Sequence, residues 1–193
     1  MKLVSPLLFA ASAVLALPAA AAPVTYDIDP SHTYPSFEAD HMGGLSTWRG
    51  KFNQTAGVIV LDREARSGTL DITVQIDSVD FGHDEMNRHA VAPDIFDAAR
   101  YPTATFKGRF TEFDGDRPEA AEGEFTLRGV TRPLKLDIDD FKCIQHPMEK
   151  REVCGADVST SFNRGDYGLD FGLDMGFKPE VELDIQVEAG RRP

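Results

Sequence analysis

An alternation of apolar and polar residues with a period of two runs through most of this chain and limits the folds open to it. The pattern is clearest in the segments 70–76, 104–111, 123–128, 134–138 and 181–187. Successive side chains of a β-strand point to opposite faces of the sheet, so each segment predicts a strand with one apolar face and one polar face. Strands of this kind belong to antiparallel sheets that bury one side only.

Four further segments extend the pattern. The segments 24–28 and 37–41 predict two more strands, and 48–53 and 57–62 predict a further strand or a hairpin. Roughly eight to ten single-faced strands must cover their apolar faces, either by packing two sheets together or by closing one sheet into a barrel. Closure also removes exposed sheet edges. The sequence therefore favours an all-β fold, an antiparallel barrel of about eight strands.

The apolar faces mix bulky residues with small ones, namely Ala39, Ala104, Gly108 and Gly123. Barrels of about eight strands either fill with side chains or hold one small ligand. The small residues suggest space inside, but a filled, tapered barrel has the same mixture. Both alternatives stay open at this point.

Two regions lack the alternation. In the connection 83–100, the segments 84–91 and 93–99 are each compatible with a short helix, so one or two helices are expected there, with Pro93 at a first helical position. The segment 163–175 is rich in glycine and aspartate and predicts a long loop with one helical turn.

The N-terminal segment has the order of a signal peptide. Lys2 is followed by an apolar run over 3–17 and by small residues at 19–22. That run is shorter than the about 20 apolar residues that a membrane-spanning helix needs. Proline is unfavourable directly after a cleaved bond, so we place the cut after Ala21, before Ala22-Pro23. We expect residues 1–21 to be a signal peptide and 22–193 a single periplasmic domain; the alternative is an uncleaved anchor.

The chain is strongly acidic, with a formal net charge of −12 that becomes one unit more negative if Lys2 is removed. Such a charge argues against binding to nucleic acids and to anionic lipid surfaces, because both repel it.

The two cysteines, Cys143 and Cys154, predict a disulfide, as an even pair does in an exported protein. The flanking sequence is strand-like on both sides, so the bond is expected to join two neighbouring strands near their turn. The alternative is a metal or redox pair. Such a pair needs closer spacing or neighbouring histidines, and His146 is the one histidine nearby.

The chain lacks the usual catalytic motifs: no glycine-rich phosphate loop, no G-x-S-x-G and no H-E-x-x-H occurs. We therefore expect no enzyme, no metal and no cofactor. The histidines are interpreted as surface or rim residues; the alternative is a metal site in which His41 joins His83 and His89 in space. Aspartates 166, 170 and 174 are interpreted as a solvated loop rather than a calcium site.

Several segments, in order along the chain, resemble the YceI-like family of exported lipid-binding proteins. They are Tyr26–His32, Phe37, His41–Gly43, Gly50–Phe52, Tyr101–Phe106, Leu127–Leu134 and Asn163–Gly168. The cysteine pair resembles a feature of one branch of the family. The resemblance implies a lipocalin-like antiparallel barrel whose interior holds a long isoprenoid, such as a polyprenyl chain or an isoprenoid quinone, or another amphiphile.

One stretch departs from the family pattern. Where the family often has R-D-x-H-L, this chain has Met86, Asn87, Arg88, His89 and Ala90. If the family arginine holds a pyrophosphate, this chain is expected to prefer a less charged head group, unless Arg88 compensates.

The resulting hypothesis is a periplasmic carrier or reservoir for an isoprenoid-type lipid. One alternative is a partner protein that delivers a quinone to a membrane cytochrome, or acts in stress tolerance, with transient membrane contact; a homodimer is compatible with either. An enzyme acting on lipid is the third hypothesis. The candidate ligand-binding residues are the apolar set Phe37, Ala39, Phe52, Ile72, Val74, Phe106, Phe110, Phe125, Leu136, Leu183 and Ile185; Met86, Phe96 and Phe171 at the mouth; and His41, His89 and Arg164 at the polar end.

Overall fold

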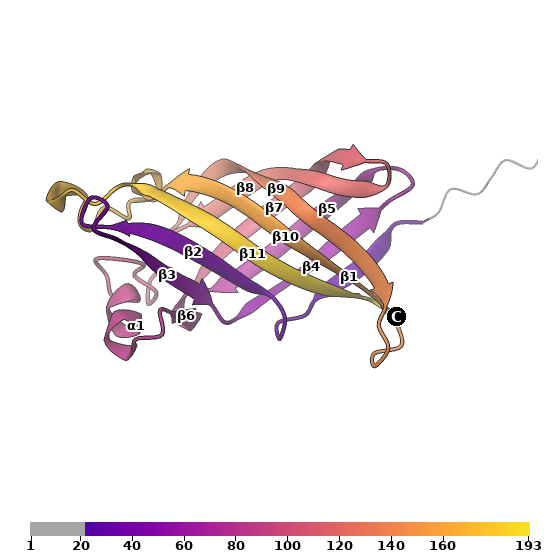
Figure 1. The fold of residues 1–193 in the computed structure, drawn as a ribbon, viewed down its shortest axis with the longest axis horizontal. Coiled ribbons are helices and arrows are strands. Elements are labelled where there is room, and N and C mark those ends of the chain that lie inside the picture. Colours follow the sequence, from indigo (N-terminus) through magenta and orange to yellow (C-terminus); the bar gives the residue numbers. More distant parts are fainter. Residues whose placement is uncertain (1–21) are drawn as a thin grey trace, which may run out of the picture.

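The computed structural model describes residues 22–193, so the predicted signal peptide lies outside the described residues. The described part of the chain forms one antiparallel sheet and one short helix, α1 (Asp84–Ala90) (Figure 1). The strands are β1 (Val24–Ile28), β2 (Tyr34–His41), β3 (Ser46–Phe52), β4 (Thr55–Asp62), β5 (Ser67–Gln75), β6 (Val79–Asp80), β7 (Thr103–Asp114), β8 (Arg117–Leu127), β9 (Val130–Gln145), β10 (Glu152–Asn163) and β11 (Glu180–Arg191).

The sheet closes on itself. Its order is β1-β4-β5-β7-β8-β9-β10-β11, and β11 pairs back with β1 to complete a ring of eight strands. The remaining strands β2, β3 and β6 continue the order beyond β11. The all-β antiparallel barrel that the alternation favours, and that the family resemblance implies to be lipocalin-like, is confirmed. Closing the ring places the apolar faces of the strands inside.

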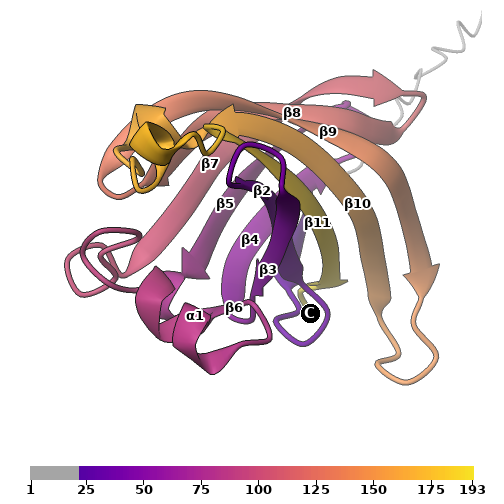
Figure 2. The same cartoon turned by 60° about the vertical axis from the view of Figure 1, so that its left-hand side comes forward.

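Three of the eight strand positions around the barrel are each occupied by two strands that follow one another in the sequence (Figure 2). Strands β1 and β2 both pair antiparallel with β11, and β4 and β3 pair with β1 and β2 in turn. Likewise β5 pairs with β4, and β6 pairs with β3. The segments 48–53 and 57–62 therefore form one interrupted strand and not a hairpin.

The interruption between β1 and β2 is closed by a side chain. Thr33, which is 2% exposed, accepts a hydrogen bond from the Glu188 amide (3.1 Å) and donates one to the Glu188 carbonyl (3.2 Å). The Asp29 amide donates to the same carbonyl (2.9 Å). The backbone of Glu188 therefore keeps partners where the ladder is broken, as a buried backbone requires.

The connection 83–100 holds one helix rather than two. The His83 imidazole caps α1 by accepting from the Met86 amide (3.4 Å). Residues 93–99 form turns instead, so one of the one or two helices expected in this connection is present. Asp97 has φ of 51°, in the left-handed region that interrupts a right-handed helix, and the Ala92 carbonyl accepts from the amides of both Ile95 and Asp97.

The long loop after β10 contains two short 3₁₀ turns, Arg164–Tyr167 and Leu173–Met175, where the sequence predicted one helical turn. Glycines with positive φ at 168, 172 and 176 end or begin these turns. None of the helices among residues 22–193 combines the length and apolarity needed to cross a membrane.

One end of the barrel is filled by side chains, and we call it the packed end. Its buried residues are Tyr26, Ile28, Leu61, Cys154 and Ala189. Cys143 and Cys154 are directly opposite each other on β9 and β10 and form a disulfide, which confirms the predicted bond between neighbouring strands.

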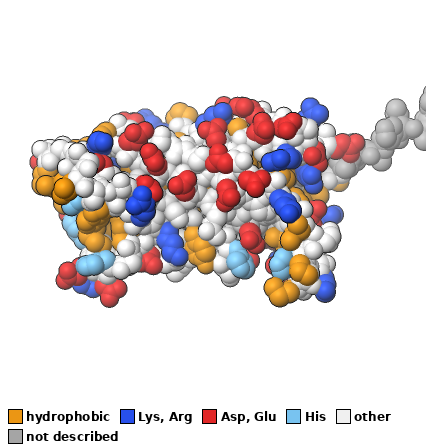
Figure 3. Space-filling model, viewed as in Figure 1, with side chains coloured by type: hydrophobic (Ala, Val, Ile, Leu, Met, Phe, Trp, Pro, Cys, Tyr) orange, Lys and Arg blue, Asp and Glu red, His pale blue; other side chains and the backbone are white. Residues whose placement is uncertain are grey.

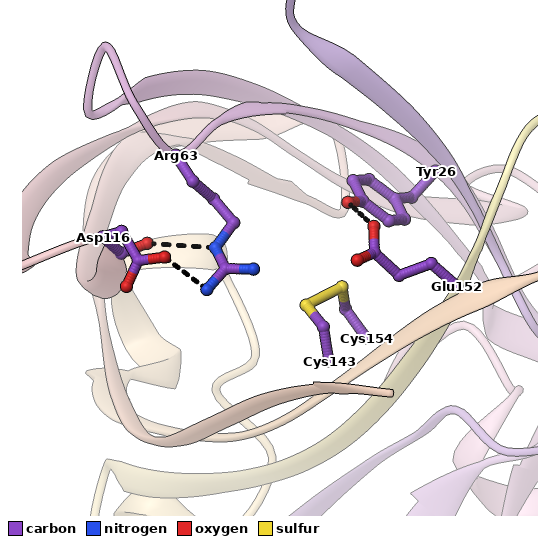
Figure 4. The surroundings of a disulfide bond; sticks show 6 residues. All are labelled: Tyr26, Arg63, Asp116, Cys143, Glu152 and Cys154. Carbon is purple, nitrogen blue, oxygen red and sulfur yellow. Dashed lines mark hydrogen bonds and ion pairs between the residues drawn. A yellow bond between two sulfur atoms is a disulfide. The ribbon is translucent and has the colours of Figure 1, made fainter. Parts of the chain in front are cut away.

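Polar groups flank the disulfide at the packed end (Figure 4). The Tyr26 hydroxyl donates to the Glu152 carboxylate (2.7 Å), while Arg63 pairs with Asp116. Burial, together with the hydrogen bond to Glu152, raises the pKa of Tyr26, so this hydroxyl stays protonated as the donor.

Candidate binding cavity

A cavity of about 520 Å³ occupies the other part of the barrel, a volume typical of ligand sites. Its lining is overwhelmingly apolar and comes from the inward faces of the strands. The deeper lining includes Phe37, Phe52, Ile72, Val74, Ile76, Phe106, Phe125, Phe162, Val181, Leu183 and Ile185. The hollow alternative left open by the sequence is therefore the one that the structure has.

The small residues of the wall do not create this space by themselves. The Phe37 ring covers Gly50, and the Phe106 ring covers Gly108, so that an added Cβ at either glycine would lie 2.5–2.8 Å from ring atoms. The glycines therefore let the rings lie flat against the wall, and space remains along the axis.

Five side chains form the floor of the cavity. They line both the cavity and a smaller space of about 70 Å³ at the packed end: Ile59, Leu70, Leu136, Val158 and Val187. Phe110 lies beyond this floor, among residues of the packed end. The cavity is thus closed below by a layer of side chains.

The mouth is formed by the β2–β3 turn, α1, the turns at 91–102 and the loop after β10. Arg128 ties the last two together by donating to the carbonyls of Gly168 and Pro93. The residues that line the cavity at this level include Met42, Trp48, Phe81, Met86, Ile95, Phe96, Phe171, Met175 and Phe177.

Among the described residues, Arg164 is the one lysine or arginine whose side chain lines the cavity. Its Nη1 donates to the carbonyls of Leu169 (2.6 Å) and Phe171 (2.8 Å), and its Nε donates to that of Lys178 (3.4 Å). Within residues 22–193 no hydrogen bond engages Nη2. Burial lowers the pKa of Arg164 from its ordinary value. An arginine guanidinium in a protein nevertheless stays charged at neutral pH.

Two histidines line the mouth, each against a phenylalanine of the loop after β10. His41 stacks on Trp48 (4.6 Å between ring centroids) and meets the Phe177 ring edge-on (5.2 Å). His89 meets Phe171 in the same way (5.2 Å), and its Nε2 lies 3.0 Å from the Asp94 carboxylate. These rings hold the loop in place on both sides of the opening.

Asp40 joins the β2–β3 turn to the chain before β11. Its carboxylate accepts from the amides of Gly43 and Lys178, each at 2.9 Å. These backbone hydrogen bonds, the one from Lys178 first, hold the pKa of Asp40 below its usual value.

All the candidate ligand-binding residues predicted from the sequence line this cavity except Phe110. The residues that the sequence analysis missed include Trp48, Phe81, Phe162 and Phe177. Trp48 belongs to a segment that the alternation assigned as strand, so its period could have indicated an inward face. Phe81 and Phe177 lie in connections, where no period exists.

Two further predictions concern charged residues around the mouth. Arg88 does not line the cavity; it pairs with Glu85 (3.9 Å) on the exposed side of α1. In the part of the chain that the structure describes, aspartates 166, 170 and 174 do not gather into a ligand cluster.

Comparison with known proteins identifies relatives over the whole described domain. A family model described as the YceI-like domain matches residues 26–189. A UPF0312 protein of Shewanella sp. (strain MR-7) is 31% identical over 176 residues, covering 90% of both chains. A UPF0312 protein of Vibrio cholerae is 29% identical over 181 residues, covering 92% of this chain and 93% of the relative.

Solved structures share the fold at lower identity. BcnA of Burkholderia cenocepacia matches with a TM-score of 0.68 and 18% identity, over 83% of this chain and 98% of that chain. A polyisoprenoid binding domain from Saccharophagus degradans matches with a TM-score of 0.61 and 16% identity, over 88% and 99% of the two chains.

Proposed function

The chain belongs to the YceI-like domain family, and from this premise we propose that it binds a long isoprenoid or a similar single-chain amphiphile inside its barrel. The observation that carries the proposal is the deep apolar cavity with polar groups confined to its mouth. Each methylene removed from water contributes about 0.8 kcal/mol, so an apolar chain gains most in such a tunnel. One structural neighbour is itself described as a polyisoprenoid binding domain.

The polar head of the ligand belongs at the mouth, because burying it without hydrogen bonds is costly. At the mouth, Nη2 of Arg164 is available to donate a hydrogen bond to the head group. The Asn87 side chain is already used: its Oδ1 accepts from the Phe81 amide (2.8 Å) and its Nδ2 donates to Asp80 (3.1 Å). With Arg88 directed away from the cavity, this arrangement favours a weakly charged head, such as a quinone ring or an amide, over a pyrophosphate.

In the cell the protein acts, in this proposal, as an exported carrier or reservoir without catalysis. Residues 1–21 supply the export signal. The intact mass of the protein isolated from its host then corresponds to a chain that begins at Ala22. A mass that retains the leader would contradict export with cleavage.

Extraction of lipid from natively purified protein, followed by mass spectrometry, tests the binding proposal. We expect about one lipid per chain, or uptake when a polyprenol or quinone is added. Val74→Trp fills the cavity from its wall and should abolish this binding, whereas Thr69→Trp, on the exposed face of the same strand, should not. Absence of lipid from both fresh and supplemented protein overturns the proposal.

Delivery to a membrane is a second candidate, favoured by exposed apolar side chains at the mouth. Met42 and Leu45 lie in the β2–β3 turn, and Phe171 and Met175 lie in the adjacent loop. Figure 3 shows apolar side chains gathered at the two ends of the molecule and acidic ones over the wall between them. The acidic wall makes a neutral bilayer a better target than an anionic one.

Flotation with phosphatidylcholine vesicles tests delivery. The double variant Leu45→Ser, Met175→Ser should float less than the unaltered protein. Met148→Ser removes a side chain that is 81% exposed but lies in the β9–β10 turn, and it should change nothing. Equal flotation of all three proteins would contradict membrane contact through the mouth.

A further inference from the structure

A second concave surface lies on the outside of the barrel, over β9, β10 and β11. It encloses about 510 Å³ between the β1–β2 loop and the β9–β10 turn, which project from the same side of the barrel (Figure 1). Its charged and imidazole side chains are His32, Asp140, Lys142, His146, Asp157 and Glu188. This outer groove is polar, unlike the interior, and plays no part in the binding proposed above.

Metal-ligating side chains converge at one edge of the groove. Asp29, His32 and Glu188 each offer one donor atom, and these atoms all lie within 4.8 Å of one another. Glu188 is far in sequence from Asp29 and His32, but the hydrogen bonds of Thr33 and of the Asp29 amide to the Glu188 backbone fix the two segments against each other. The donor set is therefore held by the framework of the barrel.

The Glu188 carboxylate lacks a partner of its own. It is partly buried, yet within residues 22–193 it accepts no hydrogen bond and forms no ion pair. The neighbouring imidazole already has one ring nitrogen engaged, because His32 Nδ1 lies 2.7 Å from the Asp29 carboxylate. In the deprotonated imidazole a cation can take the place of the proton between these two atoms, so that His32 and Asp29 ligate the same ion.

The charges around the imidazole favour a cation. Lys142 is the basic residue that lines the groove within the described residues, against three carboxylates. Arg151 is bound to Glu149 (2.6 Å) and so neutralises that side chain rather than Glu188.

We propose that Asp29, His32 and Glu188 form a surface site for a divalent cation of the zinc class. Imidazole nitrogen and carboxylate oxygen are ligands that Zn²⁺ uses, at distances of about 2.0–2.2 Å. Donor atoms no more than 4.8 Å apart need shifts of about an ångström to reach one ion at these distances. The bound ion would join the loop after β1 to β11, across the seam that closes the barrel.

Titration of the tag-free protein with ZnCl₂, followed by calorimetry, tests the site. We expect one saturable site per chain and a rise in Tm with added Zn²⁺. His32→Ala and Glu188→Gln should each weaken binding about tenfold or more and abolish the rise in Tm, as is usual for changes in a metal site. His83→Asn is the matched control, since it removes one imidazole from the cap of α1, a position that asparagine also caps well.

Two results would overturn the proposal: no saturable Zn²⁺ binding, or equal binding by the unaltered protein and both site variants. The unliganded Tm of each variant separates a loss of metal from a loss of fold. Lipid content, measured on the same samples, is independent of this site because the cavity lies on the other side of the wall.

Discussion

At the scale of single residues, two glycines set how closely the strands of one wall approach. Gly108 on β7 and Gly123 on β8 are paired across the ladder. A Cβ on Gly123 would lie 2.3 Å from the Lys107 carbonyl oxygen and 2.5 Å from the Gly108 Cα, both backbone atoms. Since backbone cannot move aside as a flexible side chain does, a larger residue must distort the wall.

Gly123→Ala is therefore expected to destabilise the protein by about 1–3 kcal/mol, the usual cost of overpacking. Urea unfolding measures the difference. Gly155→Ala is the control, because its Cβ would meet its nearest atoms only at 3.7–3.8 Å. Equal midpoints for the two variants would show that the wall adapts freely at Gly123.

Asp40 is the residue whose titration links two loops of the mouth. Its pKa is lowered in the folded state, chiefly by the hydrogen bond from the Lys178 amide. Its stabilising effect is thus complete above the unfolded pKa of about 3.9 and is lost as the pH falls through the folded value.

We expect the protection of the Lys178 amide against hydrogen exchange, corrected for the intrinsic rate, to fall below about pH 4. Asp40→Asn should show weaker protection at neutral pH and no such step. If the variant reproduced the pH profile of the unaltered protein, another group would control this contact.

At the scale of elements, the interrupted strands show where prediction from the sequence reaches its limit. The alternation correctly gave the inward faces, because a period of two fixes which side chains share a face once a segment is a strand. It treats each segment alone, however, and cannot tell a hairpin from an interruption. Residues 53–54 do not reverse the chain: their amides donate to the Ser78 carbonyl and hydroxyl, across a matching break in the neighbouring strand.

The same limit applies to the mouth, where side chains are placed by loops. The sequence indicated Arg164 and the histidines as candidates for the polar end of the site. It did not indicate that Nη1 of Arg164 donates hydrogen bonds to two carbonyls of its own loop. It also did not indicate that Asn87 holds the start of α1. Such uses depend on which connections meet in space, and no local pattern records them.

The β9–β10 hairpin supplies a prediction at this scale. Its disulfide closes a loop with a sequence separation of 11, so breaking it should cost about 3 kcal/mol or less. Urea unfolding with and without reductant measures the cost. The urea midpoint of the double variant Cys143→Ala, Cys154→Ala should not change with reductant. The midpoint of the unaltered protein should fall, when reduced, toward that of the double variant. Lipid binding should persist in both, because the bond lies at the packed end, away from the mouth.

At the scale of the whole molecule, the barrel is a tunnel of limited depth. The floor separates the cavity of about 520 Å³ from a small space at the packed end. In the proposed function, the position of this floor decides the longest chain that can be buried completely.

Leu136→Ala opens the floor toward the packed end and should lengthen the longest isoprenoid alcohol that binds, at a cost of about 2–5 kcal/mol in stability. Leu136→Phe should shorten it. Native mass spectrometry with alcohols of increasing length reads out both changes, with Glu182→Ala, exposed on β11, as control. A length limit that is unchanged in both variants would place the end of the ligand elsewhere.

The seam between the first and last strands has a consequence for how the cavity arises. The other neighbours in the ring of eight pair residues at most 40 positions apart, as Thr69 and Arg109 are, whereas Tyr26 pairs with Arg191, 165 positions away. Contacts across so much intervening chain form late and slowly, because loop closure must precede the gain from pairing. Until β11 is in place, the chain is a curved sheet with two open edges and no enclosed volume. If the protein binds an apolar chain as proposed, uptake of that chain and pairing of β11 with β1 are expected to occur together, because the cavity is enclosed only once the ring is closed.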